Sequence, residues 1–143
     1  MKVLKICKLK PDAIIPSYAH DSDSGMDLHA IGNYTLQPGK VVMVSTGIAI
    51  QLEKGYEAQI RPRSGLACKN TITVINSPGT IDAGYTGEIL IGLYNSGNFT
   101  YRVNNLDKVA QMVICPVLHP VIEIVDNLIV SERGGNGFGS TGK

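Results

Sequence analysis

Polar and apolar residues alternate along most of this chain in the pattern typical of β-strands. Apolar residues recur at every second position or form short runs rich in Val, Ile and Thr, and Gly, Pro and Asn separate the runs. Alternation with a period of two predicts half-buried strands, and the recurring turn residues favour a sandwich or barrel of roughly ten short strands. We expect strands within residues 3–9, 26–30, 41–50, 56–61, 71–75, 89–94, 99–103, 109–117 and 121–125.

Two local features interrupt this pattern. The run at 41–50 is rich in β-branched residues, as a strand buried on both faces would be. It contains Gly47, which indicates a bulge or the close approach of another backbone. Ser64 or Gly65 opens the only run that suits a helix, and this helix would be two turns long at most.

Residues 76–88 form the most informative segment. They separate the apolar runs 71–75 and 89–94, which predicts a β-hairpin whose connection is longer and more polar than a tight turn requires. Asp82 and Tyr85 lie in this connection, close enough in sequence to face one ligand. We therefore expect the connection to have a function of its own.

Composition narrows the class of protein. The 143 residues suit one domain, which we place at residues 1–130, followed by a flexible glycine-rich arm at 131–143. The net charge is only +1, so we expect no broad nucleic-acid-binding surface. No apolar run is long enough to cross a membrane, and three scattered cysteines predict reduced thiols and a cytoplasmic protein.

Three polar residues outside the hairpin each allow two interpretations. Asp27 follows a polar stretch and is either a turn carboxylate or a site residue. Ser64, with Arg63 beside it, is either an ordinary helix N-cap or part of a small anion site. Gln111 lies in an apolar strand, where it is either paired within the sheet or directed at a ligand.

The glycine-rich arm cannot fold by itself, because its five glycines from Gly134 to Gly142 lose much backbone entropy and bury little apolar area. Residues 137–142 match the pattern G-x-G-x-x-G, and 137–143 match most of a Walker A pattern. The first requires a following helix in a βαβ unit and the second also a Ser or Thr that is absent, so we reject both. The arm nevertheless contains groups that suit a nucleotide, namely Arg133, Phe138, Ser140 and Thr141.

Five segments together resemble the homotrimeric dUTPases (deoxyuridine 5′-triphosphate nucleotidohydrolases). They occur in the order and at the spacing of that family and are residues 24–28, 62–66, 79–88, 109–112 and 133–142. The resemblance spans essentially the whole chain. It implies an all-β, jelly-roll-like β-barrel subunit of the β-clip type and a homotrimer with shared active sites. The implied enzyme is a Mg²⁺-dependent dUTP diphosphatase that forms dUMP and pyrophosphate, supplies dUMP for dTMP synthesis and keeps uracil out of DNA.

By this resemblance the hairpin carries the chemistry. Asp82 would be the general base that deprotonates the water attacking the α-phosphorus. Tyr85 would pack against the deoxyribose and leave no room for a 2′-hydroxyl. The backbone around Asn76 and Gly79 would read uracil by hydrogen bonding.

The same resemblance assigns the other segments to the phosphates and the metal. Arg63, Ser64 and Gly65 would bind the phosphate chain, Gln111 the α-phosphate or the attacking water, and Asp27 the Mg²⁺ through water.

The arm would close over the nucleotide as a lid. Phe138 would stack on uracil, Arg133 would meet the γ-phosphate, and Gly139, Ser140 and Thr141 would line the phosphates.

Several positions depart from the family pattern without removing an expected catalytic group: Ser24, Met26, Ala83, Gly84 and Asn136. Two alternatives remain open. One is a dCTP deaminase of the same superfamily, which would need a glutamate base where Asp82 stands. The other is a catalytically inert member that binds nucleotides or regulates another protein.

Overall fold

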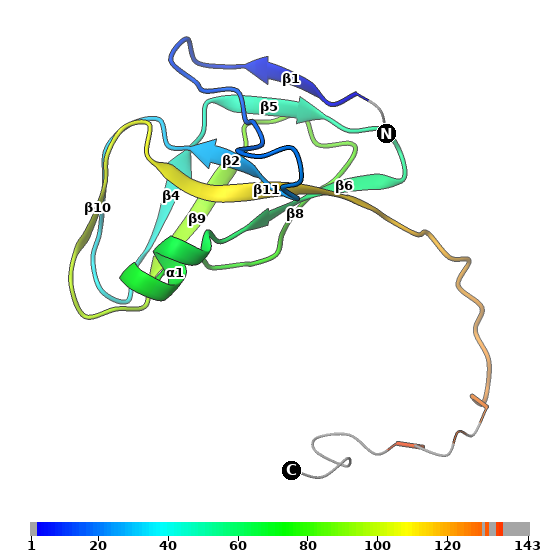
Figure 1. Cartoon of the computed structure of the whole chain (residues 1–143). Helices are drawn as coiled ribbons and strands as arrows, with labels where there is room; N and C mark the ends of the chain where they lie inside the picture. The colour runs from blue at the N-terminus through cyan, green and yellow to red at the C-terminus, as the bar shows by residue number, and fades with distance from the viewer. Residues whose placement is uncertain (1–2, 130, 132–133, 136–143) are drawn as a thin grey trace.

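The computed structural model describes residues 3–129, 131 and 134–135, and this part of the chain is mainly β-structure (Figure 1). It contains eleven strands and one helix of 7 residues, and no helix in it is long and apolar enough to span a membrane. In chain order the elements are β1 Lys5–Lys8, β2 Met26–His29, β3 Tyr34–Leu36, β4 Val41–Ser45, β5 Ile48–Gln51, β6 Tyr56–Arg61, α1 Ser64–Asn70, β7 Ile72–Val74, β8 Gly79–Ile81, β9 Leu90–Asn95, β10 Tyr101–Val103 and β11 Lys108–Pro116.

The strands pair in antiparallel fashion and form four small sheets. The largest has the order β2-β11-β6-β8, the second has the order β4-β9-β7, and the pairs β1-β5 and β3-β10 complete the set. Most neighbours are far apart in sequence, so the chain crosses between sheets repeatedly, as in a jelly roll. The predicted all-β, jelly-roll-like architecture is confirmed, although the described strands form separate sheets and not one closed hydrogen-bonded barrel.

The predicted alternation gives β2 and β6 an inward and an outward face. Met26 and Leu28 on β2 are buried, as are Ala58 and Ile60 on β6. Because no strand ladder joins one sheet to another, burial of their shared apolar cluster is the main force that holds the sheets together. The cluster also contains Leu36, Val44, Ile48, Ile72, Leu93, Val103 and Met112.

The run at 41–50 forms two strands, β4 and β5, and not one. Gly47 separates them with a φ of +68°, a conformation that favours glycine. A Cβ atom there would lie 2.9 Å from Ala13 Cβ and 3.1 Å from Lys10 Cβ, and the backbone N–H of Leu9 donates to the carbonyl of Gly47 at 2.7 Å, so the predicted close backbone approach is confirmed. Burial on both faces is wrong for β4, where Met43 is 56% exposed, because nothing in the described chain covers that face.

The predicted hairpin is present, with one addition. β7 and β9 pair antiparallel, with Val74 opposite Leu93. The connection between them contains β8, which pairs with β6 in a different sheet. Residues 76–88 therefore link two sheets, and β8 fixes the first half of the connection.

The last part of the described chain does not pack on the body. β11 ends at Pro116, and Val117 still donates its backbone N–H to the carbonyl of Gly55. Residues 118–129 are exposed, and Figure 1 shows them running away from the sheets. The strand predicted at 121–125 is wrong for the single chain, because a strand needs a neighbour for its backbone hydrogen bonds and no described segment supplies one. The domain division at residue 130 stays a prediction.

Replacing Gly47 by alanine should lower the free energy of unfolding by about 2–5 kcal/mol, the sum of a left-handed residue and an overpacked methyl group. Gly39→Ala is a matched control, because Gly39 has a φ of +69° and no atom within 4 Å of its Cβ position. In Gly39→Ala the free energy of unfolding should fall only by the cost of a left-handed alanine, about 1–2 kcal/mol. Urea denaturation at one protein concentration measures both, and equal losses would contradict the packing argument.

Candidate active site

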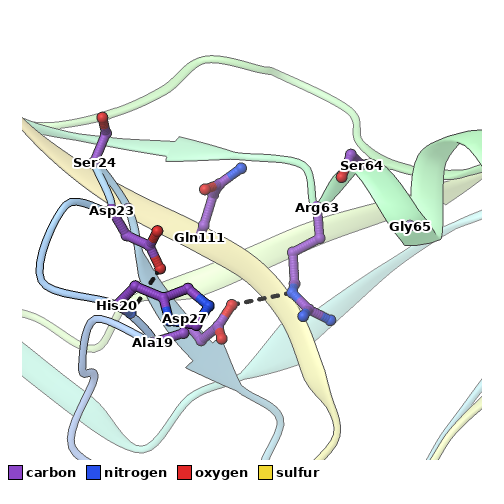
Figure 2. A pocket seen from close by; sticks show the side chains of 10 residues that line it. Ala19, His20, Asp23, Ser24, Asp27, Arg63, Ser64, Gly65 and Gln111 are labelled. Atoms are coloured by element: carbon purple, nitrogen blue, oxygen red, sulfur yellow. Dashed lines mark hydrogen bonds and ion pairs between the residues drawn. The ribbon is translucent and has the colours of Figure 1, made fainter.

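A hollow of about 410 Å³ lies where β2, β11 and the start of α1 meet (Figure 2). We call it the polar hollow. It includes the predicted site residues Asp27, Arg63, Ser64, Gly65 and Gln111. Its remaining walls are Ala19, His20, Asp23, Ser24 and Gly25, from the polar stretch before β2.

Strand pairing builds the polar hollow. Gln111 on β11 lies opposite Asp27 on β2 and opposite Arg61 on β6. Arg63 and Ser64 lie two and three residues after the end of β6, so the same pairing brings them to the hollow. The hydrogen bonds of the β11 backbone therefore bring together side chains that are far apart in sequence.

Ser64 is not the helix N-cap. Arg63 occupies that position, with φ −84° and ψ 131°, and α1 has no side-chain cap hydrogen bond. Ser64 is the first helical residue, and its exposed side chain lines the polar hollow. The interpretation as an ordinary N-cap serine is therefore wrong, and the hydroxyl is left at the wall of the hollow.

Gln111 is constrained from two sides. Its Nε2 donates to the carbonyl oxygen of Pro62 at 3.0 Å. Its Oε1 lies against Gly25, where an added Cβ atom would collide with it. Both interpretations of Gln111 therefore hold, since the side chain is paired with backbone and also lines the polar hollow.

Asp27 is an ionised carboxylate paired with two cations. Arg63 Nε lies 3.0 Å from Oδ1, and Lys108 Nζ lies 2.7 Å from Oδ2. Partial burial is the largest single influence and raises the pKa of Asp27, but the hydrogen bonds and charges of Lys108 and Arg63 together outweigh it and place the pKa below its ordinary value. Asp27 is thus charged at neutral pH, and it lies in strand β2 with Arg63 and Lys108 as its partners, so the interpretation as a turn carboxylate is wrong.

Sequence reasoning misses Lys108 and His29. Lys108 directly precedes the segment 109–112, and it reaches Asp27 because it lies opposite His29 in the β2-β11 pair. Partial burial, and next the charge of Lys108, lower the pKa of His29. Only the strand register could have revealed either residue, because neither stands in a recognisable motif.

Among the described residues, only Asp27 was predicted to contact Mg²⁺, and that role stays a prediction. The described residues contain no group of three or more His, Cys, Asp or Glu side chains that could hold a metal ion. The predicted metal residue, Asp27, already has a cation on each oxygen. Mg²⁺ usually keeps several waters and takes ligands from substrate phosphates, so a single carboxylate at the polar hollow suits the predicted role.

The hairpin residues line two adjoining hollows, apart from the polar hollow. Asp82 and Tyr85 lie in one of about 190 Å³, the hairpin hollow, together with Thr80, Ile81, Glu88 and Leu90. Asn76 and Gly79 line a smaller one of about 40 Å³. Neither shares a lining residue with the polar hollow. The hairpin hollow and the smaller one have Thr80, Ile81 and Leu90 in common, so a single chain gathers the predicted residues into two groups and not into one.

Tyr85 is fixed by hydrogen bonds of its own segment. Its backbone N–H donates to the carbonyl of Asp82 at 3.0 Å, and its hydroxyl donates to the carbonyl of Glu88 at 2.8 Å. The hydroxyl is thus occupied, while the side chain of Tyr85 is 45% exposed and the carboxylate of Asp82 is exposed beside it. The ring face of Tyr85 is the part that a ligand can contact.

The predicted lid residues, Arg133, Phe138, Gly139, Ser140 and Thr141, lie outside the described residues. Their roles stay predictions.

Comparison with known proteins decides the family. A family model described as dUTPase matches residues 11–142. The chain belongs to the dUTPase family. A deoxyuridine 5′-triphosphate nucleotidohydrolase of Clostridium tetani is 56% identical over 140 residues, which cover 98% of this chain and 97% of the relative. That of Gloeothece citriformis is 53% identical over 139 residues, with 97% and 96% covered.

Solved dUTPase structures share the fold. A dUTPase of Staphylococcus bacteriophage 80alpha with dUpNHpp has a TM-score of 0.93 at 27% identity, with 100% of both chains covered. A mutant dUTPase of phage phi11 of S. aureus, described with a coordinated structural Mg(II) ion, has a TM-score of 0.83 at 26% identity, with 88% of this chain and 98% of that chain covered. The predicted dUTPase family, fold and activity class are confirmed, while the roles of single residues stay predictions.

Gly25→Ala should impair this dUTPase by displacing Gln111 from its position in the polar hollow. We expect kcat/KM for dUTP to fall by roughly tenfold to a hundredfold, because a misplacement of about 1 Å near the reacting groups has effects of this size. A double-mutant cycle with Gln111→Ala checks the cause. If Gly25 acts through Gln111, the double variant will be no slower than Gln111→Ala alone, whereas additive losses would contradict this mechanism.

Proposed function

We propose that the protein hydrolyses dUTP to dUMP and pyrophosphate by attack of a water, activated by Asp82, on the α-phosphorus. The observation that carries this proposal is the convergence of Arg63, Ser64 and Gln111 on one hollow beside an ionised carboxylate, Asp27. These groups supply the donors and the charge that a triphosphate with its metal requires.

The polar hollow would hold the phosphate chain. Arg63 uses Nε for Asp27 and Nη1 for the carbonyl of Lys108, which leaves its second terminal nitrogen for a phosphate oxygen. The Ser64 hydroxyl and the Gly65 backbone would donate further hydrogen bonds. Lys108 pairs with the other carboxylate oxygen of Asp27, so this carboxylate is held from both sides.

Mg²⁺ on the phosphates, with Asp27 in contact with its water shell, would neutralise the charge that builds on the phosphate oxygens. Asp27 contributes by staying ionised and by lining the wall of the same hollow.

The hairpin hollow would bind the nucleoside and the attacking water. Asp82 is exposed there and can accept a proton from water, and Tyr85 presents its ring to the sugar. The strand edge at Asn76 and Gly79 would read uracil with backbone groups. A site that hydrogen-bonds its base rejects mismatched bases far better than a site that senses only shape.

Because these groups lie in separate hollows of one chain, we propose that the complete site forms between copies in a homotrimer. The segment 118–129 supports an assembly, since six of its apolar residues are almost fully exposed in the single chain: Leu118, Val121, Ile122, Ile124, Leu128 and Ile129. Such a segment lowers its free energy by packing on another copy. The arm at 131–143 would then close over the nucleotide, with Arg133, Phe138, Gly139, Ser140 and Thr141 in the roles given above.

The cytoplasm remains the compartment that we propose. Cys7, Cys68 and Cys115 are all free thiols in the structure, which suits a reducing environment.

Pyrophosphate release from dUTP, UTP, dTTP and dCTP tests the proposed function. We expect rapid release from dUTP alone. Ammonia release from dCTP would favour a deaminase, and nucleotide binding without turnover would favour an inert member.

Asp82→Asn should reduce turnover of dUTP by roughly a hundredfold to ten-thousandfold, the usual contribution of a general base. The amide is nearly isosteric with the carboxylate, so affinity for a nonhydrolysable dUTP analogue, measured by calorimetry, should change little. Turnover near that of the unsubstituted protein would contradict the role of Asp82 as the base.

A chain that ends at Ser131 should lose at least about a hundredfold in kcat/KM, because without the lid the substrate is neither shielded nor positioned. It should still assemble as a trimer, since it retains the body and residues 118–129. Steady-state kinetics and size-exclusion chromatography measure the two effects. Monomers on the column would show that the arm has a structural role instead.

A further inference from the structure

Glu88, at the end of the hairpin segment, is held by a different part of the molecule. Its Oε1 accepts hydrogen bonds from Ser45 Oγ and, at 2.8 Å, from the backbone N–H of Gly47. Lys10 Nζ donates to Ser45 Oγ at 2.7 Å and lies 3.7 Å from Glu88 Oε1. None of these three partners lines the polar hollow or the hairpin hollow.

The backbone next to Glu88 is also hydrogen-bonded to the turn between β4 and β5. The N–H of Ile89 donates to the carbonyl of Ile48 at 2.9 Å, and Thr46 Oγ1 donates to the carbonyl of Ile89 at 2.7 Å. Side chain and backbone together attach residues 88–89 to the turn between β4 and β5, which Gly47 packs tightly against the N-terminal segment. This turn anchors the C-terminal end of the hairpin connection.

The side chain of Tyr85 is positioned by contacts with the anchored residues 87–88. Its hydroxyl donates to the carbonyl of Glu88 itself, and the Cβ position of Gly87 lies 2.6 Å from the hydroxyl oxygen. The ring is thus folded back over residues 87–88. Ala83 packs against the core cluster, but Gly84, which directly precedes Tyr85, has no side chain and no atom within 4 Å of its Cβ position, so Tyr85 depends on the anchored end of the segment for its position.

Glu88 is better suited to anchoring than to proton transfer. Partial burial is the largest influence and raises the pKa of Glu88, but hydrogen bonds from Ser45 and Gly47 and the charge of Lys10 outweigh it and place the pKa below its ordinary value. A carboxylate that already accepts these bonds holds its charge and its position through the reaction.

We infer that Glu88 is a positioning residue that sets the discrimination between dUTP and UTP, by fixing the ring of Tyr85 relative to the sugar. The inference rests on the proposed function, in which Tyr85 packs against the deoxyribose. Removing the anchor would let the ring move away and admit a 2′-hydroxyl.

The test compares kcat/KM for dUTP with kcat/KM for UTP in variants of the full chain. Glu88→Ala should lower this ratio by about tenfold or more, because the exclusion of one hydroxyl depends on the position of the ring. Glu88→Gln keeps an oxygen that can accept from Ser45 and Gly47, so its ratio should stay within about threefold of the original protein. Ser45→Ala removes one hydrogen-bond donor to Glu88, so its ratio should lie between those of Glu88→Ala and Glu88→Gln.

Glu53→Gln is the matched control, because Glu53 is an exposed glutamate at a turn remote from the hairpin in sequence. The ratio of kcat/KM for dUTP to kcat/KM for UTP should not change in this variant. A purely structural role of Glu88 would reduce the folded fraction and scale both substrates equally. An unchanged ratio in Glu88→Ala would therefore overturn the inference. If that variant does not fold, an unchanged ratio in Ser45→Ala overturns it in the same way.

Hydrogen exchange provides a second measurement that needs no activity. In Glu88→Ala, or in Ser45→Ala, the amides of residues 83–88 should exchange faster, while those of α1 keep their rates. Unchanged exchange at 83–88 would show that Glu88 is not the anchor. Failure of the unsubstituted protein to hydrolyse dUTP would refute the proposed function instead, and the exchange rates would still decide whether the anchor exists.

Discussion

Strand β11 pairs with β2 along one edge and with β6 along the other, and the polar hollow exists because of this double pairing. A side chain at the centre of a three-stranded arrangement has a fixed neighbour on each side. For Gln111 these neighbours are Asp27 and Arg61, and β6 then delivers Arg63 to the same place. The side chains of the polar hollow are thus brought together mainly by the backbone pairing of β11, and only their final positions depend on side-chain contacts.

The side-chain interactions at the polar hollow and at the hairpin differ in kind. In the polar hollow, two cations hold one carboxylate, Asp27, in a setting that is only partly buried. Added salt therefore weakens those attractions, and a phosphate can compete for Arg63. At the hairpin, Glu88 is held by a neutral hydroxyl and a backbone amide in addition to Lys10. The first arrangement can exchange partners during binding, and the second holds one geometry.

How far the sequence predicts this structure depends on whether a feature is local. Strand periodicity correctly predicted β6 and β11, and the position of Gly47 within a strand pattern predicted its close contacts. Both signals arise from neighbouring residues and their backbone. The five family segments located Asp27, Arg63, Ser64 and Gln111, which the fold places in one hollow. Lys108 and the partners of Glu88 depend on strand register and on contacts between distant turns, which no local pattern encodes. The expected strand at 121–125 had the right composition, but composition cannot supply the neighbour that a strand requires.

The exposed segment 118–129 has a consequence for how the behaviour of the chain depends on protein concentration. A single folded chain carries a long apolar extension in water, with Leu118 at 90% and Ile129 at 98% exposure. Unpartnered segments of this kind promote non-specific association, so a dilute or newly synthesised chain is at greater risk of aggregation than an assembled one. When association buries such a segment, apparent stability rises with protein concentration, and a melting temperature has meaning only together with the concentration at which it was measured.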